Sequence, residues 1–306
     1  MSKHLGALDR VVLGAGLIFA VLSGWAALGP GSMALPVAVQ VVNVLAMITF
    51  LLGHMLKHLG VKLMIAFFLT AAVIEWAFEQ SNISFGGFIW GELQYGNLGV
   101  FSVHVGDVPL AVPILMAAIL WPTYAAVNLA LDGRVVTDPK SMAWWQNIWR
   151  CLLYGMVHSW LMLMINGVCE KYGIYTWVGR TAALRQANPA DVFLGDPTAP
   201  RGWAIYVFVT MLVFTFVMVP LLGRTALEPA ERGLNWADGV PVLFFLVMGI
   251  QMYASPANLT EGNIALWTFG FFGAFVGYRF VALMRAQAQP PAVGGRTSPE
   301  SDAVTH

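Results

Sequence analysis

Long apolar segments are the feature of this chain that most restricts its fold. Eight of them have about the 20 residues that a helix needs to cross the hydrocarbon core of a bilayer. They are residues 11–29, 34–55, 61–79, 107–130, 147–169, 203–223, 239–256 and 262–284. Charged residues make up only 10% of the chain, against about 25% in soluble domains, so polar surface is too scarce to cover a water-soluble protein. We predict an all-α integral membrane protein, a bundle of about eight transmembrane helices within residues 1–286.

The rest of the composition limits the partners that this chain can have. The formal net charge is zero, so no basic face predicts nucleic-acid binding. Cys151 and Cys169 share one apolar segment and are separated by about 27 Å of straight helix, which is too far for a disulfide between them. Residues 287–306, rich in Pro, Ala, Gly and Ser, predict a disordered cytoplasmic tail.

Lysine and arginine residues alternate between the connections and predict the orientation of the helices. They occur near the N-terminus, in every second connection after it, and in the tail. The connections 30–33, 80–106 and 257–261 contain neither residue, whereas 170–202 contains four and is the exception. By the positive-inside rule, we predict a protein of the cytoplasmic (inner) membrane with both termini in the cytoplasm. Residues 80–106 and 170–202 then share the opposite face.

Two acidic residues near the end of the third segment are candidates for function. Glu75 and Glu79 are one helical turn apart and share a helix face. A solvated helix end would explain Glu79, which we expect to lie closer to water. Glu75 lies deeper, between Ile74 and Trp76, where burial favours the neutral acid. A neutral carboxylic acid in an apolar pocket is a proton donor, so we predict that Glu75 is a general acid.

Aromatic residues accompany acidic residues at two places that the predicted orientation brings to one membrane face. The first group, after Glu75, is Phe85, Phe88 and Trp90, and the second, after Glu170, is Tyr172, Tyr175 and Trp177. Aromatic anchors at a membrane interface would have this composition. Because the pattern occurs twice beside a carboxylate, we favour rings that stabilise a carbocation by cation–π attraction. We therefore expect Glu75 and residues 166–177 to line one pocket.

Other polar side chains fall inside the predicted spans or at their ends. His158 and Asn166 are in the fifth segment, where polar groups commonly hydrogen-bond to neighbouring helices, and His158 can also relay a proton. Asp107 suits the N-cap of the fourth segment. His54 and His58 share a helix face and suggest a metal site. The chain has no HExxH or CxxC motif and no third histidine near them, so we predict neither a metal ion nor another cofactor.

The order of these elements resembles the carotenoid biosynthesis membrane-protein family, which includes the bisanhydrobacterioruberin hydratases. The family has a Glu at the end of a span, then an aromatic–Gly pair and two alternate aromatics, matched by Glu75, Phe85-Gly86, Phe88 and Trp90. Its G-x-V-P-x-x-x-P helix start corresponds to residues 106–113, and its Gly-x-aromatic-x-aromatic element to residues 173–177. A G-x-P…G-W element corresponds to residues 195–203. The resemblance covers residues 60–220 and implies a carotenoid hydratase of the hydro-lyase type.

The chain also departs from the family pattern. Phe78 and Asn82 stand where the family has glycines, and Asn166-Gly167 stands where it has Asp-Pro, with Glu170 one turn further on. The stretch from Glu170 to Tyr175 also resembles the membrane spirocyclases of polyketide pathways. Both resemblances imply acid-assisted chemistry on a long apolar substrate.

Together, the residues and the resemblance predict a membrane-embedded enzyme that modifies a carotenoid or another isoprenoid. Glu75 protonates a terminal C=C, the aromatic residues and His158 bind the substrate, and water adds under the direction of Glu170 or Asn166. The expected partners are a lipophilic polyene, the lipid bilayer and other enzymes of the same pathway. Two alternatives stay open, spirocyclase-like cyclisation and small-molecule transport. A transporter would place polar residues in broken helices near the bilayer midplane, whereas these carboxylates lie at the ends of segments.

Overall fold

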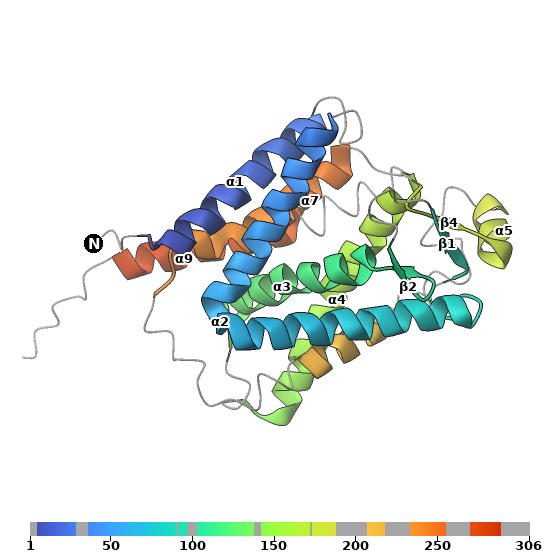
Figure 1. The fold of residues 1–306 in the computed structure, drawn as a ribbon. Coiled ribbons are helices and arrows are strands. Elements are labelled where there is room, and N and C mark those ends of the chain that lie inside the picture. Colours follow the sequence, from blue (N-terminus) through green and yellow to red (C-terminus); the bar gives the residue numbers. More distant parts are fainter. Residues whose placement is uncertain are drawn as a thin grey trace, which may run out of the picture.

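The computed structural model describes nine stretches of the chain, in which helices predominate (Figure 1). The described residues are 5–28, 36–89, 91–96, 103–137, 142–171, 173–187, 207–217, 233–254 and 270–288. The helices are α1 (Ala7–Leu28), α2 (Val37–Ser84), α3 (Ala111–Asp132), α4 (Trp144–Lys171), α5 (Gly179–Ala187), the 3-10 helix η4 (Trp236–Gly239), α7 (Val240–Ala254) and α9 (Phe271–Ala288). A further helical stretch is Val207–Val217. Each of the eight apolar segments therefore contains helix among its described residues.

Helix α2 joins the second and third apolar segments in one element of 48 residues. Gly60 interrupts it with φ 67° and ψ 168°, a backbone conformation that is almost confined to glycine. The helix bends there, so that its first arm lies along α1 and its second arm runs beside α3 (Figure 1). The sequence predicted a connection at residues 56–60, but the chain stays helical up to the bend, and Lys57 and His58 belong to the first arm.

Helix α3 is the central element of the bundle. In its most apolar stretch 78% of the residues are buried, against 33% in α1 and 28% in α2. Its Trp121 and Tyr124 are fully buried and stack with ring centroids 5.5 Å apart. Pro122 lies inside the helix, which is tolerated where neighbouring helices satisfy the freed carbonyl groups. The described helices α2, α4, α7 and α9 all contact α3.

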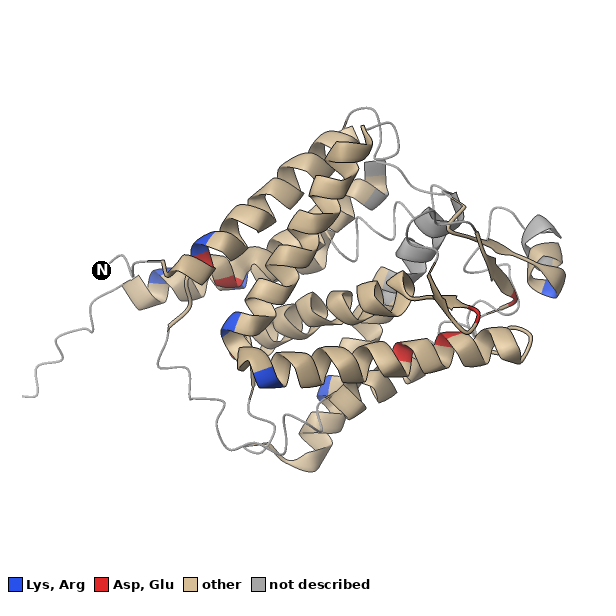
Figure 2. Cartoon of the chain, in the orientation of Figure 1, with Lys and Arg blue, Asp and Glu red and all other residues tan. Residues whose placement is uncertain are grey.

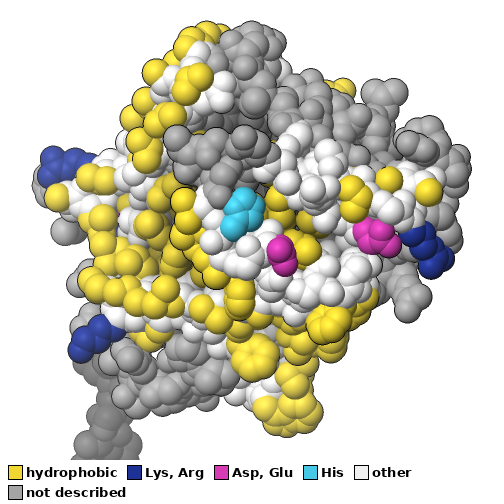
Figure 3. Space-filling model, turned by 45° about the vertical axis from the view of Figure 1, so that its right-hand side comes forward, with side chains coloured by type: hydrophobic (Ala, Val, Ile, Leu, Met, Phe, Trp, Pro, Cys, Tyr) yellow, Lys and Arg dark blue, Asp and Glu magenta, His cyan; other side chains and the backbone are white. Residues whose placement is uncertain are grey.

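The outward faces of α1 and α2 are apolar. Val21 and Leu28 on α1, with Val37 and Val73 on α2, expose between 60% and 81% of their surface, and hydrophobic side chains cover much of the described surface in Figure 3. Among the described residues, three helices, α1, α2 and α3, are long and apolar enough to cross a membrane. A helical, membrane-compatible chain is thus confirmed, and the other spans of the eight-helix bundle stay predictions.

Two short antiparallel ribbons add strands that the all-α prediction lacked. In the first, β1 (Leu93–Tyr95) pairs with β4 (Tyr175–Trp177), with Tyr95 opposite Tyr175. In the second, β2 (His104–Val105) pairs with β3 (Val108–Pro109). The β1–β4 ribbon connects the two segments, 80–106 and 170–202, that the sequence placed on one membrane face. This pairing brings their aromatic residues together.

Charged residues are distributed unevenly between the ends of the bundle. Lysine and arginine gather where α1 begins and α2 bends (Figure 2), and Asp9 and Asp238 pair with Lys57 there. Other acidic residues lie on the second arm of α2 and near the ribbons (Figure 2). The start of α1 and the end of α9 lie at the same end of the bundle (Figure 1). Helix α9 continues to Ala288, two residues beyond the predicted domain end at 286. The later residues of the predicted tail lie outside the described residues.

Candidate functional site

Glu75 and Glu79 lie on the second arm of α2 and are both buried. Their relative exposures are 4% and 5%, so the expectation that Glu79 lies closer to water is wrong. The cause is tertiary, because Tyr95 of the β1–β4 ribbon donates a hydrogen bond to Glu79 Oε2 at 3.2 Å. Among the described residues, Glu79 is the charged group that acts on Glu75. Two acids thus share one buried helix face.

The turn after α2 positions the ribbon against this pair. Gly87 has φ 73°, and a Cβ there would come within 2.2 Å of the backbone at residues 91–92, so the turn requires glycine. Asn82, which is fully buried, accepts a hydrogen bond from the Ile89 amide at 3.1 Å and donates one to the Gly91 carbonyl at 3.0 Å. A single amide side chain therefore closes the turn from which β1 starts.

The ribbon places a line of aromatic rings beside the acid pair. Tyr95 packs edge-on against Tyr175 with ring centroids 6.3 Å apart, and Tyr175 packs edge-on against Trp177 at 5.3 Å. Tyr175 is buried and Trp177 is partly buried. The structure thus joins Tyr175 and Trp177 to Glu79 through Tyr95. The sequence predicted that Glu75 and residues 166–177 line one pocket, which stays a prediction. The contacts described here start from Glu79, and Tyr95 was not among the predicted site residues.

The other predicted site residues have different positions. Phe85 and Phe88 contact each other edge-on at 5.8 Å, but 70% and 63% of their surface is exposed, so these rings face outward at the end of α2. His158 of α4 is buried, with Nδ1 3.4 Å from the Thr123 hydroxyl. Asn166 and Glu170 lie on α4, and their side chains are outside the described part of the structure. Trp90 and Tyr172 lie outside the described residues.

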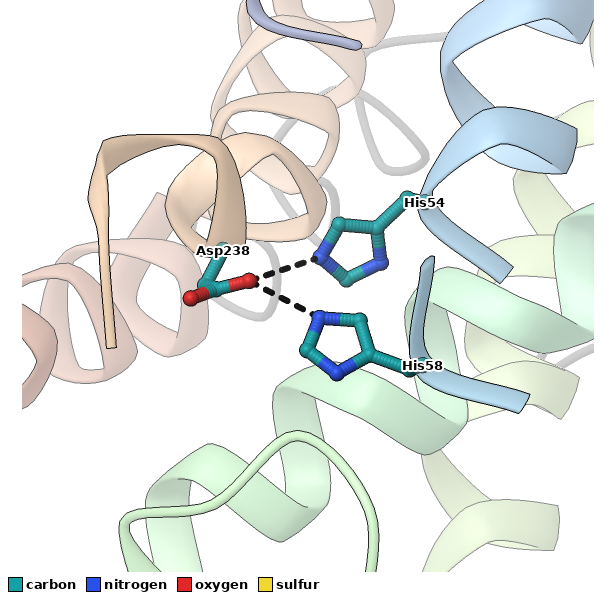
Figure 4. A group of neighbouring side chains, drawn as sticks. All are labelled: His54, His58 and Asp238. Atoms are coloured by element: carbon teal, nitrogen blue, oxygen red, sulfur yellow. Dashed lines mark hydrogen bonds and ion pairs between the residues drawn. The ribbon is translucent and has the colours of Figure 1, made fainter. Parts of the chain in front are cut away.

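A second buried polar cluster lies at the bend of α2 and was not predicted as a whole. Figure 4 shows His54 and His58 of α2 facing Asp238 of η4, and one ligand atom from each lies within 4.8 Å of the others. His58 Nε2 is 2.8 Å from Asp238 Oδ1, and Lys57 Nζ is 2.6 Å from the same oxygen. Lys57 also pairs with Asp9 of α1 at 2.7 Å. The cluster therefore ties α1, the first arm of α2 and η4 together.

The hydrogen bonds around this cluster do not suit a metal ion. The indole N–H of Trp121, which can only donate, bonds to His54 Nδ1 at 2.9 Å. A neutral His54 then carries its proton on Nε2, the atom that faces Asp238, and has no lone pair there for a metal. The Lys57 ammonium already neutralises the Asp238 oxygen that a cation would bind. The donor set is that of a buried ion-pair network.

Asp238 is held as a carboxylate by its neighbours. Burial alone would raise its pKa, but the hydrogen bond from His58 and the charges of His58 and Lys57 hold the pKa of Asp238 below its usual range. Its other oxygen accepts the backbone N–H of Asn235 at 2.8 Å, and the Asn235 side chain accepts the Ala237 amide in return. This capping box was visible in the sequence as Asn235 and Asp238. Its partners on α2 were not, because they are about 180 residues away.

Comparison of the chain with protein-family models, with characterised proteins and with solved structures gave no match. The functional argument therefore rests on the residues and their geometry.

Proposed function

We propose that the chain is a membrane-embedded enzyme that hydrates a terminal C=C of a carotenoid or another isoprenoid. The observation that carries the proposal is the buried acid pair, Glu75 and Glu79, on an apolar helix beside the aromatic rings of the β1–β4 ribbon. A buried carboxyl group held neutral is a proton donor. Apolar surroundings also suit a substrate that partitions into the bilayer.

The reaction follows from these groups without an additional reactant other than water. The Glu75 carboxyl group gives its proton to the terminal carbon of the alkene, whose π electrons form the new C–H bond, and a tertiary carbocation and a carboxylate result. A water oxygen then forms a C–O bond to the cation. The proton that this water loses goes to a carboxylate, so the products are a tertiary alcohol and the regenerated acid.

The aromatic rings supply stabilisation of the cationic intermediate. Rings of Tyr and Trp attract a cation placed over their faces, and the attraction is worth about 2 kcal/mol or more when water is excluded. Tyr175 and Trp177 pack edge-on and are two of the rings that stabilise the cation in this proposal. We call these rings the aromatic wall. In this proposal Asn166 or Glu170 directs the attacking water, and His158, Trp90 and Tyr172 contact the polyene.

Spirocyclase-like cyclisation is the second candidate, because it would begin with the same protonation by Glu75. It differs in the nucleophile, which is a group of the substrate itself, so the product has the mass of the substrate. Product mass therefore separates the two reactions.

Orientation in the cytoplasmic membrane, with both termini in the cytoplasm, belongs to the same proposal. It is supported by the lysine and arginine residues at the end of the bundle where α1 starts and α9 ends (Figure 2), by the positive-inside rule. Reporter fusions at each terminus test it. Opposite reporter signals at the two ends would exclude it.

The function is tested by expressing the full chain in a host that accumulates an acyclic carotene and analysing the pigments by mass spectrometry. Hydration predicts a product heavier by one water molecule, and growth in ¹⁸O-labelled water should place the label in it. An isomer of unchanged mass would identify cyclisation. A host whose pigments stay the same while the protein is present in its membrane would contradict both reactions.

A further inference from the structure

The two acids of α2 cannot both carry charge in their present surroundings. They are one helical turn apart, and each is at least 95% buried. Like charges at this spacing repel, and burial disfavours the ionised form of each. The pair therefore holds at least one proton, and the local contacts decide which residue carries it.

Those contacts are unequal. Glu79 accepts a hydrogen bond from the Tyr95 hydroxyl at 3.2 Å, and a hydroxyl bonds more strongly to a carboxylate than to a neutral acid. Glu75 receives no such donor from the described residues. Burial and the neighbouring Glu79 both act on its carboxyl group, and both favour the neutral acid. The asymmetry therefore places the negative charge on Glu79 and the proton on Glu75.

The position of Tyr95 is set by the ribbon rather than by α2. Tyr95 is the last residue of β1, lies opposite Tyr175 in the antiparallel register, and packs against its ring. The adjoining Gly96 amide donates to the Ile174 carbonyl at 2.9 Å. Pairing of two segments about 80 residues apart thus fixes the hydroxyl that distinguishes the two acids.

We propose that Tyr95 assigns the roles of the acid pair, so that Glu75 is the proton donor and Glu79 is the base that receives the proton of the attacking water. This inference rests on the function proposed above. After hydration Glu75 is a carboxylate and Glu79 is protonated, and transfer of that proton across one helical turn restores the starting state. Glu79 is then a catalytic residue, and Tyr95 is a positioning residue that acts through it.

Infrared spectroscopy of the purified full-length protein in lipid nanodiscs tests the assignment without substrate. A buried, protonated carboxylic acid gives a C=O stretching band distinct from that of carboxylates. At neutral pH the wild-type band should be lost in Glu75→Gln and retained in Glu79→Gln. Glu92→Gln, which changes a less buried acid at the start of β1, is the control and should retain it. A band that survives in Glu75→Gln, or vanishes in Glu79→Gln, overturns the assignment.

Tyr95→Phe provides the second arm and stays decisive if Glu75→Gln does not fold. Without the hydroxyl the proton should be shared by both acids, so the band should split or shift, and turnover should fall about tenfold, as expected for loss of a hydrogen bond to a charged group. Spectra identical to wild type at every pH overturn the role of Tyr95. Because the spectra need no substrate, expected spectra from a protein without hydratase activity would contradict only the proposed reaction.

Discussion

Glu75 and Asp238 are both buried carboxyl groups, with 4% and 2% of their surface exposed, but their surroundings differ. Asp238 receives Lys57, His58 and a backbone N–H, which together compensate its charge. Glu75 has another acid one turn away and, among the described residues, no cation. A carboxylate compensated in this way stabilises the contact between helices, and because it is ionised it has no proton to transfer. An acid left uncompensated adds no stability but keeps a transferable proton. The comparison assigns a structural role to the cluster at the bend of α2 and, under the proposed function, a chemical role to the acid pair on its second arm.

The largest effect is expected for Glu75→Gln. The amide preserves the size of the side chain but cannot protonate an alkene, so turnover should fall by about 10²–10⁴-fold, the usual contribution of a general acid. Thermal unfolding in detergent should be nearly unchanged, because a neutral amide replaces a neutral acid of almost the same size. Glu92→Gln, whose carboxylate accepts the Arg180 amide, should keep turnover near wild type. Wild-type product levels from folded Glu75→Gln would move the acid role to Glu170.

Asp238→Asn should have the reverse profile, losing stability while folded molecules keep their turnover. Removing one partner of a buried ion pair costs about 3–5 kcal/mol, and the lower part of that range applies because Lys57 retains Asp9. The control is Asp132→Asn, which breaks the ion pair between Asp132 and Arg150. The Asp132 side chain is 28% exposed, so this loss should cost about 1 kcal/mol or less. Denaturant unfolding in one detergent compares the two. Equal losses would show that the cluster at the bend is not a structural tie.

Gly60→Ala tests the bend of α2, which lies between the Asp238 cluster and the acid pair. Nothing lies within 4 Å of a Cβ at this position, so the cost is that of the backbone conformation alone, about 1–3 kcal/mol. Gly14 of α1 has equally open surroundings but is helical, so Gly14→Ala should instead stabilise by about 0.5–1 kcal/mol. Unfolding curves that move in opposite directions are the expected result. A neutral Gly60→Ala would mean that the bend tolerates a side chain.

Thr181→Val should have the smallest effect. The Thr181 hydroxyl accepts the backbone N–H of Glu92 at 2.9 Å, and losing that acceptor should cost about 1 kcal/mol. Thr215, whose hydroxyl bonds within its own helix and is exposed, is the control, and Thr215→Val should change stability by less than about 0.5 kcal/mol. Differential scanning calorimetry of both variants measures the two losses of stability and shows which is larger. A larger loss in Thr215→Val would show that α5 does not help to hold β1.

The sequence predicted those parts of the fold that depend on local pattern. The described residues of each apolar segment of span length include helix, which satisfies its own backbone hydrogen bonds in an apolar environment. Asp107 was wrongly assigned to the N-cap of α3, which begins at Ala111 without a side-chain cap. Instead Asp107 exchanges hydrogen bonds with Gln80 of α2. The short ribbons were missed because strands of two or three residues carry too little periodicity to be distinguished from a loop.

The candidate site was predictable only in part for the same reason. Glu75, Tyr175 and Trp177 stood out by their residue types and by the shared membrane face. Tyr95 and the burial of Glu79 depend on the β1–β4 pairing, and the His54–Asp238 contact depends on the position of η4. No local pattern encodes such distant contacts.

The β1–β4 ribbon also has a consequence for how the protein is made. Tyr95 and Tyr175 are partners across 80 residues of chain, which a ribosome adds in roughly 4–16 s at about 5–20 residues per second. During that interval Glu75 and Glu79 are already synthesised, while the strand that completes the aromatic wall does not yet exist. A nascent chain that stops after α3 would therefore carry the acids without the wall. The candidate site is therefore completed late in synthesis, when β4 follows α4 and pairs with β1.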